Sequence, residues 1–170
     1  MTSIVVDQLT ESRVNIGGVE TQLLSLSGAR ERVALTLPDA SCAARKRRRQ
    51  MIVIVPGNPG VGDFYRDFAR LLYRQSDEAD DVVIVSHAGH CGRATFGGRA
   101  FSLEEQVAHK LHLIDTLCGV NNETALADAG LDAASEDEPI VLMGHSIGAL
   151  INLRVVSQVC VSSVVGEPLN

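Results

Sequence analysis

Pro139-Ile140-Val141-Leu142-Met143-Gly144-His145-Ser146-Ile147-Gly148 joins an apolar run directly to a Gly-x-Ser-x-Gly motif, and helix-forming sequence follows. The apolar run has the composition of a buried strand. A serine at a sharp turn between strand and helix is held exposed, and the glycines leave room for that turn. The stretch therefore predicts a nucleophilic serine, Ser146, between the turn glycines Gly144 and Gly148.

A second segment of the chain is suited to stabilising an oxyanion. The apolar run from Met51 to Val55 leads into Pro56-Gly57-Asn58-Pro59-Gly60, whose prolines and glycines fix an irregular backbone. Acyl transfer at a serine needs backbone N–H donors on both sides of the developing charge. The predicted donors are the amides of Ile147, which follows the serine, and Asn58, since Pro59 has no N–H; Gly57 and Gly60 shape the loop. The alternative is an ordinary Pro/Gly turn.

The remaining patterns predict an α/β fold with a mostly parallel sheet. Three continuous apolar runs are typical of strands covered on both faces: 51–55, 82–85 and 140–143. Between and after these runs, apolar residues recur at helical spacing, which predicts helices in 64–72, 103–117 and 146–159. Such alternation favours a three-layer sandwich.

Other stretches extend this prediction at both ends of the chain. Alternating patterns at 20–26 and 32–37 indicate antiparallel strands, and a short run at 161–165 indicates one further strand. The acidic segment 121–138 is expected to be a surface loop with a short helix. We expect a single partial domain over 1–170, with an opening β-meander in 1–44 and a parallel βα core in 50–165.

Composition narrows the class of protein. The chain has 170 residues, 45% of them hydrophobic, and a net charge of -6, which argues for a globular domain and against nucleic-acid binding. Five consecutive cations at 45–49 are expected to be a solvated connection, or else a contact for anionic lipid headgroups. The four isolated cysteines favour a reducing compartment. No secretory signal or membrane-spanning run is visible.

The histidines do not suggest a metal site. His87 and His90 follow a predicted strand and are expected at the carboxyl edge of the sheet, without the partner ligands that zinc needs. His109 and His112 are expected on a helix surface or in a local hydrogen bond. His145 is expected to be a packing residue. No cofactor is predicted.

Four segments together resemble the lipid droplet-associated hydrolases. They are Ile54 to Gly60 with Phe64-Tyr65 after it, Val85 to His90, Leu103 to Lys110, and Gly144 to Gly148. The resemblance implies an α/β-hydrolase fold and an esterase-like activity on lipid or sterol esters. It also implies peripheral association with lipid droplets and the endoplasmic reticulum, on the cytosolic face.

The same resemblance places the nucleophile on Ser146 and the oxyanion loop on 56–60. The family's acid and histidine would lie beyond Asn170, and no histidine follows Ser146 in this chain. We therefore expect an amino-terminal portion of the fold, truncated after about the sixth strand and inactive as an enzyme by itself. The alternative is a non-catalytic α/β-hydrolase-like protein that binds droplets or membrane surfaces.

Overall fold

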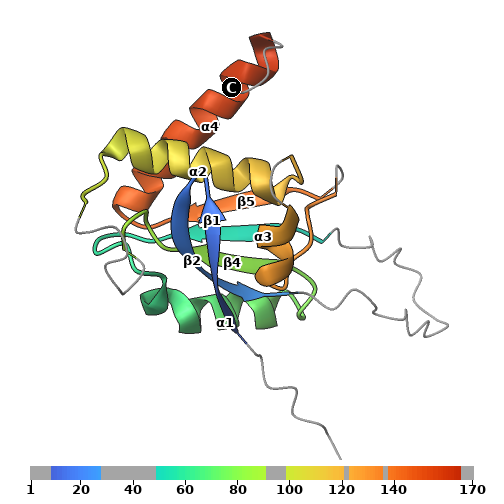
Figure 1. Ribbon diagram of the computed structural model, residues 1–170. Helices are drawn as coiled ribbons and strands as arrows, with labels where there is room; N and C mark the ends of the chain where they lie inside the picture. The colour runs from blue at the N-terminus through green and yellow to red at the C-terminus, as the bar shows by residue number, and fades with distance from the viewer. Residues whose placement is uncertain (1–8, 28–48, 91–98, 121–122, 136–137, 166–170) are drawn as a thin grey trace, which may run out of the picture.

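The computed structural model describes residues 9–27, 49–90, 99–120, 123–135 and 138–165. They form a five-stranded sheet in the order β1-β2-β4-β3-β5, with helices on both faces (Figure 1). The strands are β1 Thr10–Ile16, β2 Val19–Leu26, β3 Met51–Val55, β4 Asp81–Val85 and β5 Ile140–Gly144. The helices are η1 Gly62–Tyr65, α1 Arg66–Gln75, α2 Leu103–Leu117, α3 Glu123–Asp128 and α4 Ile147–Val165.

The sheet is parallel where the predicted core strands lie. β3 pairs in parallel with both β4 and β5, whereas β2 is antiparallel to β1 and to β4. The carboxyl ends of β3 and β5 therefore meet at one edge, with Val55 opposite Gly144. The segments that follow these two strands, 56–60 and 145–148, are brought together by this register.

Alternate residues of β3 explain why its sequence is apolar throughout. Met51, Val53 and Val55 pack in the core shared with α2 and α3. Ile52 and Ile54 pack on the other face with α1. Both faces of the strand are therefore covered, which confirms the three-layer α/β sandwich (Figure 1).

One strand prediction at the carboxyl end is wrong. Residues 161–165 belong to α4, which continues from Ile147 to Val165 without a break. Once a helix is nucleated, each added residue gains a hydrogen bond at little extra cost, so the β-branched residues there continue the helix. At the amino end, the partner of β2 is β1, and the strand predicted at 32–37 lies outside the described residues.

Two helical surfaces also differ from prediction. The apolar positions Phe64, Phe68 and Leu71, expected to face the core, are 75%, 44% and 58% exposed, while Ala69 and Tyr73 are the buried residues of α1. The segment 121–138 was predicted to be a surface loop with a short helix, and α3 is that helix, but the segment contributes to the core rather than lying only at the surface. Its buried side chains are Ala125, Leu126, Ala129 and Leu131.

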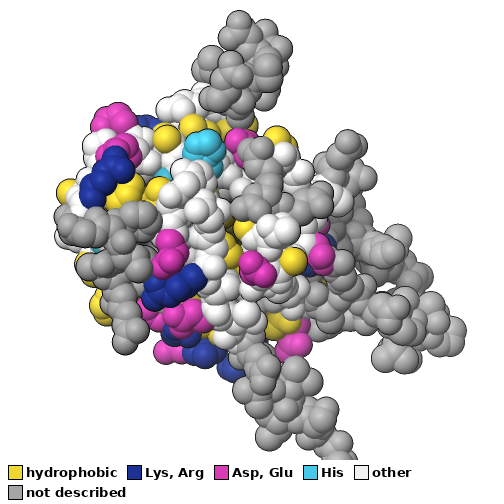
Figure 2. Space-filling view, in the orientation of Figure 1, with side chains coloured by type: hydrophobic (Ala, Val, Ile, Leu, Met, Phe, Trp, Pro, Cys, Tyr) yellow, Lys and Arg dark blue, Asp and Glu magenta, His cyan; other side chains and the backbone are white. Residues whose placement is uncertain are grey.

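Charged side chains are intermixed on the face seen in Figure 2. Of the basic run, Arg49 is described, and it forms ion pairs with Asp81 and with Glu138, the latter at 3.1 Å. The interpretation of the whole run as a solvated connection is therefore wrong at Arg49. In the described part of the chain, no helix is long and apolar enough to cross a membrane.

Candidate functional site

Ser146 lies in the turn between β5 and α4, with its side chain exposed to solvent. Its φ is 54°, in the left-handed region that non-glycine residues rarely occupy. Such a conformation costs on the order of 1–3 kcal/mol and persists only where surrounding contacts enforce it. The chain thus holds a strained serine at the carboxyl edge of the sheet.

The glycines on either side of this serine make the close approach possible. A Cβ atom on Gly148 would lie 2.2 Å from the Val55 carbonyl oxygen and 2.4 Å from that of Pro56. A Cβ atom on Gly144 would lie 2.6 Å from the Ala149 nitrogen. Glycine at these positions therefore lets the first turn of α4 pack against the end of β3.

The loop 56–60 lies beside Ser146, as its place after β3 predicts. A Cβ atom on Gly57 would be 3.1 Å from the Ser146 Cβ. The amide of His145 donates to the Val55 carbonyl oxygen at 3.3 Å and holds the two segments together. The structure therefore brings the predicted loop and the predicted serine into contact.

The backbone amides of this loop have distinct partners. Gly57 donates its N–H to the Tyr65 hydroxyl at 2.9 Å, and Gly60 donates to the Gly57 carbonyl at 2.7 Å. The two prolines have no N–H. Among the described residues, the amides of Asn58 and of Ile147 have no hydrogen-bond acceptor.

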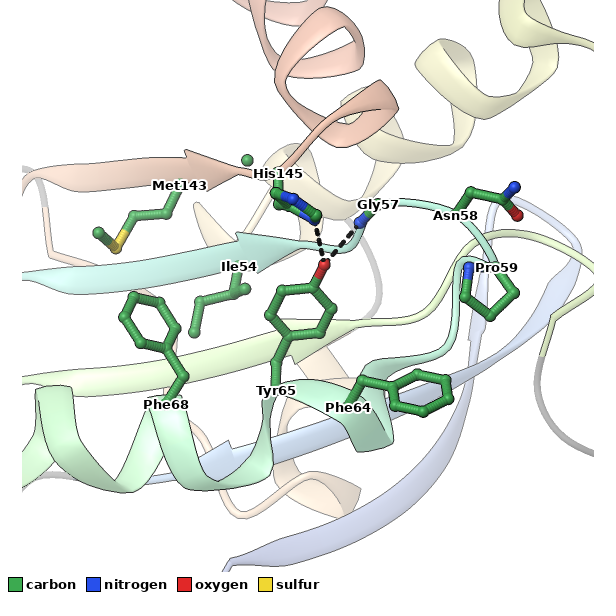
Figure 3. Close-up of a pocket in the computed structure, with 10 residues that line it drawn as sticks. Ile54, Gly57, Asn58, Pro59, Phe64, Tyr65, Phe68, Met143 and His145 are labelled. Atoms are coloured by element: carbon green, nitrogen blue, oxygen red, sulfur yellow. Dashed lines mark hydrogen bonds between the residues drawn. The ribbon is translucent and has the colours of Figure 1, made fainter.

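A cavity of about 730 Å³ opens next to this loop and beneath His145 (Figure 3). Its walls are mostly apolar, and the ring of Tyr65 lies between Phe68 and Phe64 along one side. A volume of this size is in the range of sites for small organic ligands. Its lining residues are Ile54, Gly57, Asn58, Pro59, Phe64, Tyr65, Phe68, Met143, Gly144 and His145.

His145 has a different place from the one expected. It is exposed rather than a packing residue, and its Nδ1 lies 2.9 Å from the Tyr65 hydroxyl. The two rings are tilted, with centroids 6.2 Å apart. Since the side chain follows β5 and precedes Ser146, the Tyr65 contact ties α1 to the serine turn.

His87 and His90 follow β4 and so lie at the expected edge of the sheet. His87 is buried, and its ring packs where a Cβ atom on Gly60 would come within 2.6 Å. Burial, together with the nearby Lys110 charge, lowers the pKa of His87 to about 4. His90 is exposed, and its ring meets that of His87 edge-on at 6.0 Å.

A buried polar cluster on α2 was missed by the sequence reasoning. His109 is 4% exposed and its Nε2 lies 2.7 Å from the Thr21 hydroxyl, while Lys110 donates to its Nδ1 at 2.9 Å. Burial lowers the pKa of His109 to about 2 and that of Lys110 to about 7. His109 is therefore not a surface residue, and its contact with Thr21 is long-range. The only signal in the sequence was a histidine and a lysine placed in the middle of a helix between apolar positions.

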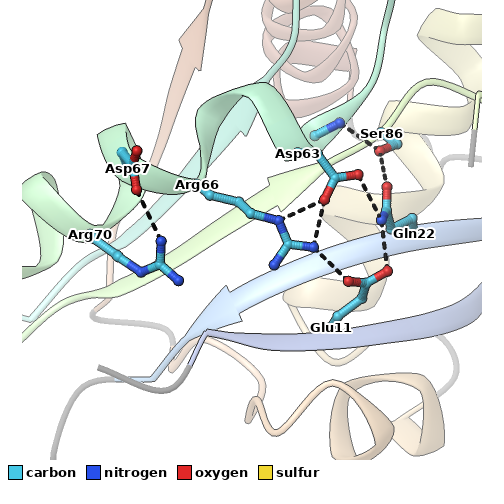
Figure 4. Close-up of polar contacts among 8 residues, drawn as sticks. Glu11, Gln22, Asp63, Arg66, Asp67, Arg70 and Ser86 are labelled. Carbon is cyan, nitrogen blue, oxygen red and sulfur yellow. Dashed lines mark hydrogen bonds and ion pairs between the residues drawn. The ribbon is translucent and has the colours of Figure 1, made fainter. Parts of the chain in front are cut away.

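A second polar network joins β1, β2, β4 and the start of α1 (Figure 4). Gln22 donates to Glu11 and to Asp63, and it accepts from the Ser86 hydroxyl at 2.8 Å. Arg66 donates to Glu11 at 2.5 Å. The hydrogen bonds from Gln22 and Arg66 lower the pKa of Glu11, and the one from Gln22 has the larger effect.

Metal-ligating groups are dispersed in the structure. In the residues that are described, no three histidine, cysteine or acidic side chains converge on one point. Cys118 is a free thiol at the surface, and partial desolvation of its sulfur, together with the nearby Asp115 carboxylate, raises its pKa. The side chains of the other three cysteines lie outside the described residues.

Comparison with known proteins gives a consistent result. Residues 48–167 match the family of the lipid-droplet associated hydrolase. The chain is 35% identical over 107 residues to the lipid droplet-associated hydrolase of Dictyostelium discoideum, covering 63% of this chain and 32% of that protein. It is 31% identical over 150 residues to the human lipid droplet-associated hydrolase, covering 88% of this chain and 43% of that protein. The chain thus spans less than half the length of these relatives.

Solved structures with a similar fold are hydrolases. An epoxide hydrolase from Vigna radiata aligns with a TM-score of 0.53 at 15% identity, over 86% of this chain and 35% of that one. A bacterial membrane phospholipase A aligns with a TM-score of 0.55 at 15% identity, over 88% of this chain and 36% of that one. At this identity the likeness concerns the fold, an α/β-hydrolase fold represented here by its first five strands in the described residues.

Proposed function

Because the chain belongs to the lipid droplet-associated hydrolase family and has the α/β-hydrolase fold, we propose that it carries the nucleophile and oxyanion site of a serine ester hydrolase. The substrates are lipid or sterol esters. The observation that carries this proposal is the left-handed, exposed Ser146 in contact with the loop 56–60.

In the proposed reaction, the Ser146 hydroxyl attacks the ester carbonyl, the ester C–O bond breaks, and the alcohol leaves with the proton that the serine gives up. Water then hydrolyses the acyl-enzyme, which releases the carboxylic acid and restores the serine. We identify the strained turn as the nucleophile elbow, because it holds Ser146 exposed at the carboxyl edge of the sheet. The amides of Asn58 and Ile147 donate to the oxyanion. Their lack of other acceptors among the described residues supports this role.

The choice of substrate class rests on the cavity beside the oxyanion loop. Its apolar walls, formed by side chains such as Ile54, Phe68 and Met143, are suited to an acyl chain or a sterol rather than to a charged group. A water-soluble ester with a charged acyl group would have to leave its solvation there without polar partners.

No described histidine or acidic side chain hydrogen-bonds the Ser146 hydroxyl. A serine without a general base reacts slowly, because only the oxyanion donors and substrate binding remain to assist it. We therefore propose that this chain by itself turns over esters slowly, although its serine site is formed.

A fluorophosphonate ester tests the nucleophile, because phosphonylation needs an attacking oxygen and oxyanion donors but no deacylation. Peptide mass spectrometry is expected to locate one slow adduct on Ser146. This adduct should be absent from Ser146→Ala and retained in Ser157→Ala, which removes an exposed hydroxyl from α4, the helix that follows Ser146. Adducts distributed equally over several serines in all three proteins would contradict the proposal.

A second candidate function is adsorption to lipid droplets on the cytosolic side of the endoplasmic reticulum, without catalysis. The outward-facing side chains of Phe64, Phe68 and Leu71 favour it, since apolar groups at a phospholipid monolayer gain burial there. Flotation with triolein–phospholipid emulsions measures adsorption, whereas the phosphonate labelling described above measures the nucleophile. Ser146→Ala is expected to float like the parent chain, and Phe64→Ser with Phe68→Ser is expected to float less.

A further inference from the structure

One hydroxyl group contacts both sides of the proposed oxyanion site. The Tyr65 oxygen lies 2.9 Å from the Gly57 nitrogen and 2.9 Å from His145 Nδ1, which is 80 residues away along the chain (Figure 3). Gly57 belongs to the loop after β3, and His145 immediately precedes the nucleophile. We propose that Tyr65 is a positioning residue that sets the distance between oxyanion loop and nucleophile, an inference that rests on the proposed function.

The direction of the two hydrogen bonds follows from their donors. A backbone N–H can only donate, so the Tyr65 oxygen accepts from Gly57. We assign the phenol proton to the second hydrogen bond, with His145 Nδ1 as its acceptor. In this assignment the proton of the His145 ring is on Nε2. Neither ring nitrogen is then available to take a proton from the Ser146 hydroxyl, so the bridge assigns His145 to geometry and not to general base catalysis.

The bridge also determines which amide of the loop faces the substrate. With the Gly57 N–H bound to Tyr65, and Gly60 bound to the Gly57 carbonyl, the amide of Asn58 remains for the oxyanion. Without the hydroxyl, the Gly57 amide would have no acceptor and the loop could turn it toward the site. Tyr65 thus selects Asn58 as the donor.

The position of the Tyr65 ring makes it a rigid support. Tyr65 ends η1 and directly precedes α1, and its side chain is partly buried against the core shared with α1. A tyrosine has only two rotatable side-chain bonds, so a ring held in this way places its hydroxyl with little freedom.

The chain offers a matched control. Its only other tyrosine, Tyr73, lies in α1, the helix that begins directly after Tyr65, and is buried, but its hydroxyl donates to the Ser27 carbonyl at 2.8 Å, away from the site. Tyr65→Phe and Tyr73→Phe each remove one hydrogen-bonded hydroxyl and keep the ring. A merely structural contribution would appear in both variants.

The experiment measures three quantities in the parent chain and the two variants. Amide hydrogen exchange at Gly57 is expected to accelerate at least about tenfold in Tyr65→Phe alone, because its acceptor is lost. The ¹⁵N signals of the His145 ring are expected to shift from one fixed tautomer toward a mixture in that variant. Phosphonate labelling of Ser146 is expected to slow about tenfold in Tyr65→Phe and to stay unchanged in Tyr73→Phe.

The outcomes separate the inference from the proposed function. Unchanged Gly57 exchange and unchanged His145 signals in Tyr65→Phe would overturn the bridge. Altered signals with labelling at the parent rate, or equal slowing in both variants, would overturn its positioning role. A parent chain that is not labelled at Ser146 would overturn the proposed function, whereas exchange and ring spectra would still report whether the bridge exists.

Discussion

Lowering the pH from 7 to 5 is expected to reduce the free energy of unfolding by about 4 kcal/mol, because two buried imidazoles resist protonation. His87 has its pKa lowered to about 4 and His109 to about 2, in each case first by burial and then by the charge of Lys110. In the unfolded chain both have the ordinary value of 6.5. The unfolded state therefore binds up to two more protons in this range.

The sign follows from that proton difference. Stability is fully present above pH 6.5 and is lost as the pH falls toward the pKa values of the folded state. Each group contributes about 1.4 kcal/mol per pH unit once the unfolded histidine is protonated, or about 2 kcal/mol between pH 7 and 5. The total is a large part of the stability of an ordinary domain, about 5–15 kcal/mol. Acid unfolding at mild pH is the consequence.

Urea unfolding followed by circular dichroism at pH 7, 6 and 5 measures this loss. His109→Gln is expected to halve the pH dependence, and His112→Gln, which changes an exposed imidazole on the same helix, is expected to leave it intact. The lowered pKa of Glu11 contributes only near and below its ordinary value of 4.5, outside the window. A free energy of unfolding that changes by less than about 1 kcal/mol between pH 7 and 5 would refute the reasoning.

Three further predictions concern α4, α2 and β5. Gly148→Ala is expected to lower the free energy of unfolding in urea by about 3 kcal/mol, because its Cβ would lie 2.2 Å from the Val55 oxygen. Gly18→Ala, which lies in open space at a φ of 83°, is expected to lower it by about 1 kcal/mol. Equal losses in the two variants would contradict this prediction. The pKa of Lys110 is about 7 in the fold and 10.5 unfolded, so stability should rise by about 2 kcal/mol from pH 7 to 9, and this rise should be absent in Lys110→Met. In the described sheet β5 pairs only with β3, so its other edge has unpaired backbone groups that a second copy of the chain can pair with. We therefore expect size-exclusion chromatography to show self-association of the parent chain, and less of it in Val141→Lys, which places a charge on this strand. A monomeric parent chain would contradict the prediction.

The parallel core could be predicted from sequence because β3 and β4 are covered on both faces and β5, although its Val141 is exposed, keeps the same continuous apolar run. The continuous apolar runs at 51–55, 82–85 and 140–143 all became strands, with bounds shifted by at most a residue at an end. The adjacency of the loop 56–60 to Ser146 also followed, since parallel neighbours place their carboxyl ends together. The strand prediction at 161–165 was wrong because it rested on composition alone, whereas these residues continue a helix that begins at Ile147.

Which side chains of a helix are buried could not be predicted in the same way. Phe64, Phe68 and Leu71 have helical spacing, but α1 buries the neighbouring face through Ala69 and Tyr73. A small alanine lets the helix approach the sheet closely, and apolar spacing does not reveal that preference. The polar contacts of Tyr65 and His109 were missed because their partners are 80 and 88 residues distant.

Other contacts between segments that are distant in the sequence hold the loop beside Ser146. Gln106 donates to the Ala88 carbonyl and accepts from the Ala88 amide, both at 2.9 Å, and so attaches α2 to the segment after β4. That segment in turn holds the loop, because the His87 amide donates to the Gly60 carbonyl at 2.8 Å.

The hydroxyl of Ser86, one residue earlier, accepts from the Gly62 amide at 2.9 Å. Lys110 donates to the Ser86 carbonyl at 3.3 Å, so a buried amine supports the same segment from α2. The loop is thus held by β4 and α2 on one side and by Tyr65 at its start. The burial of Lys110 costs stability, but its hydrogen bond fixes an irregular segment of backbone that has no strand pairing of its own.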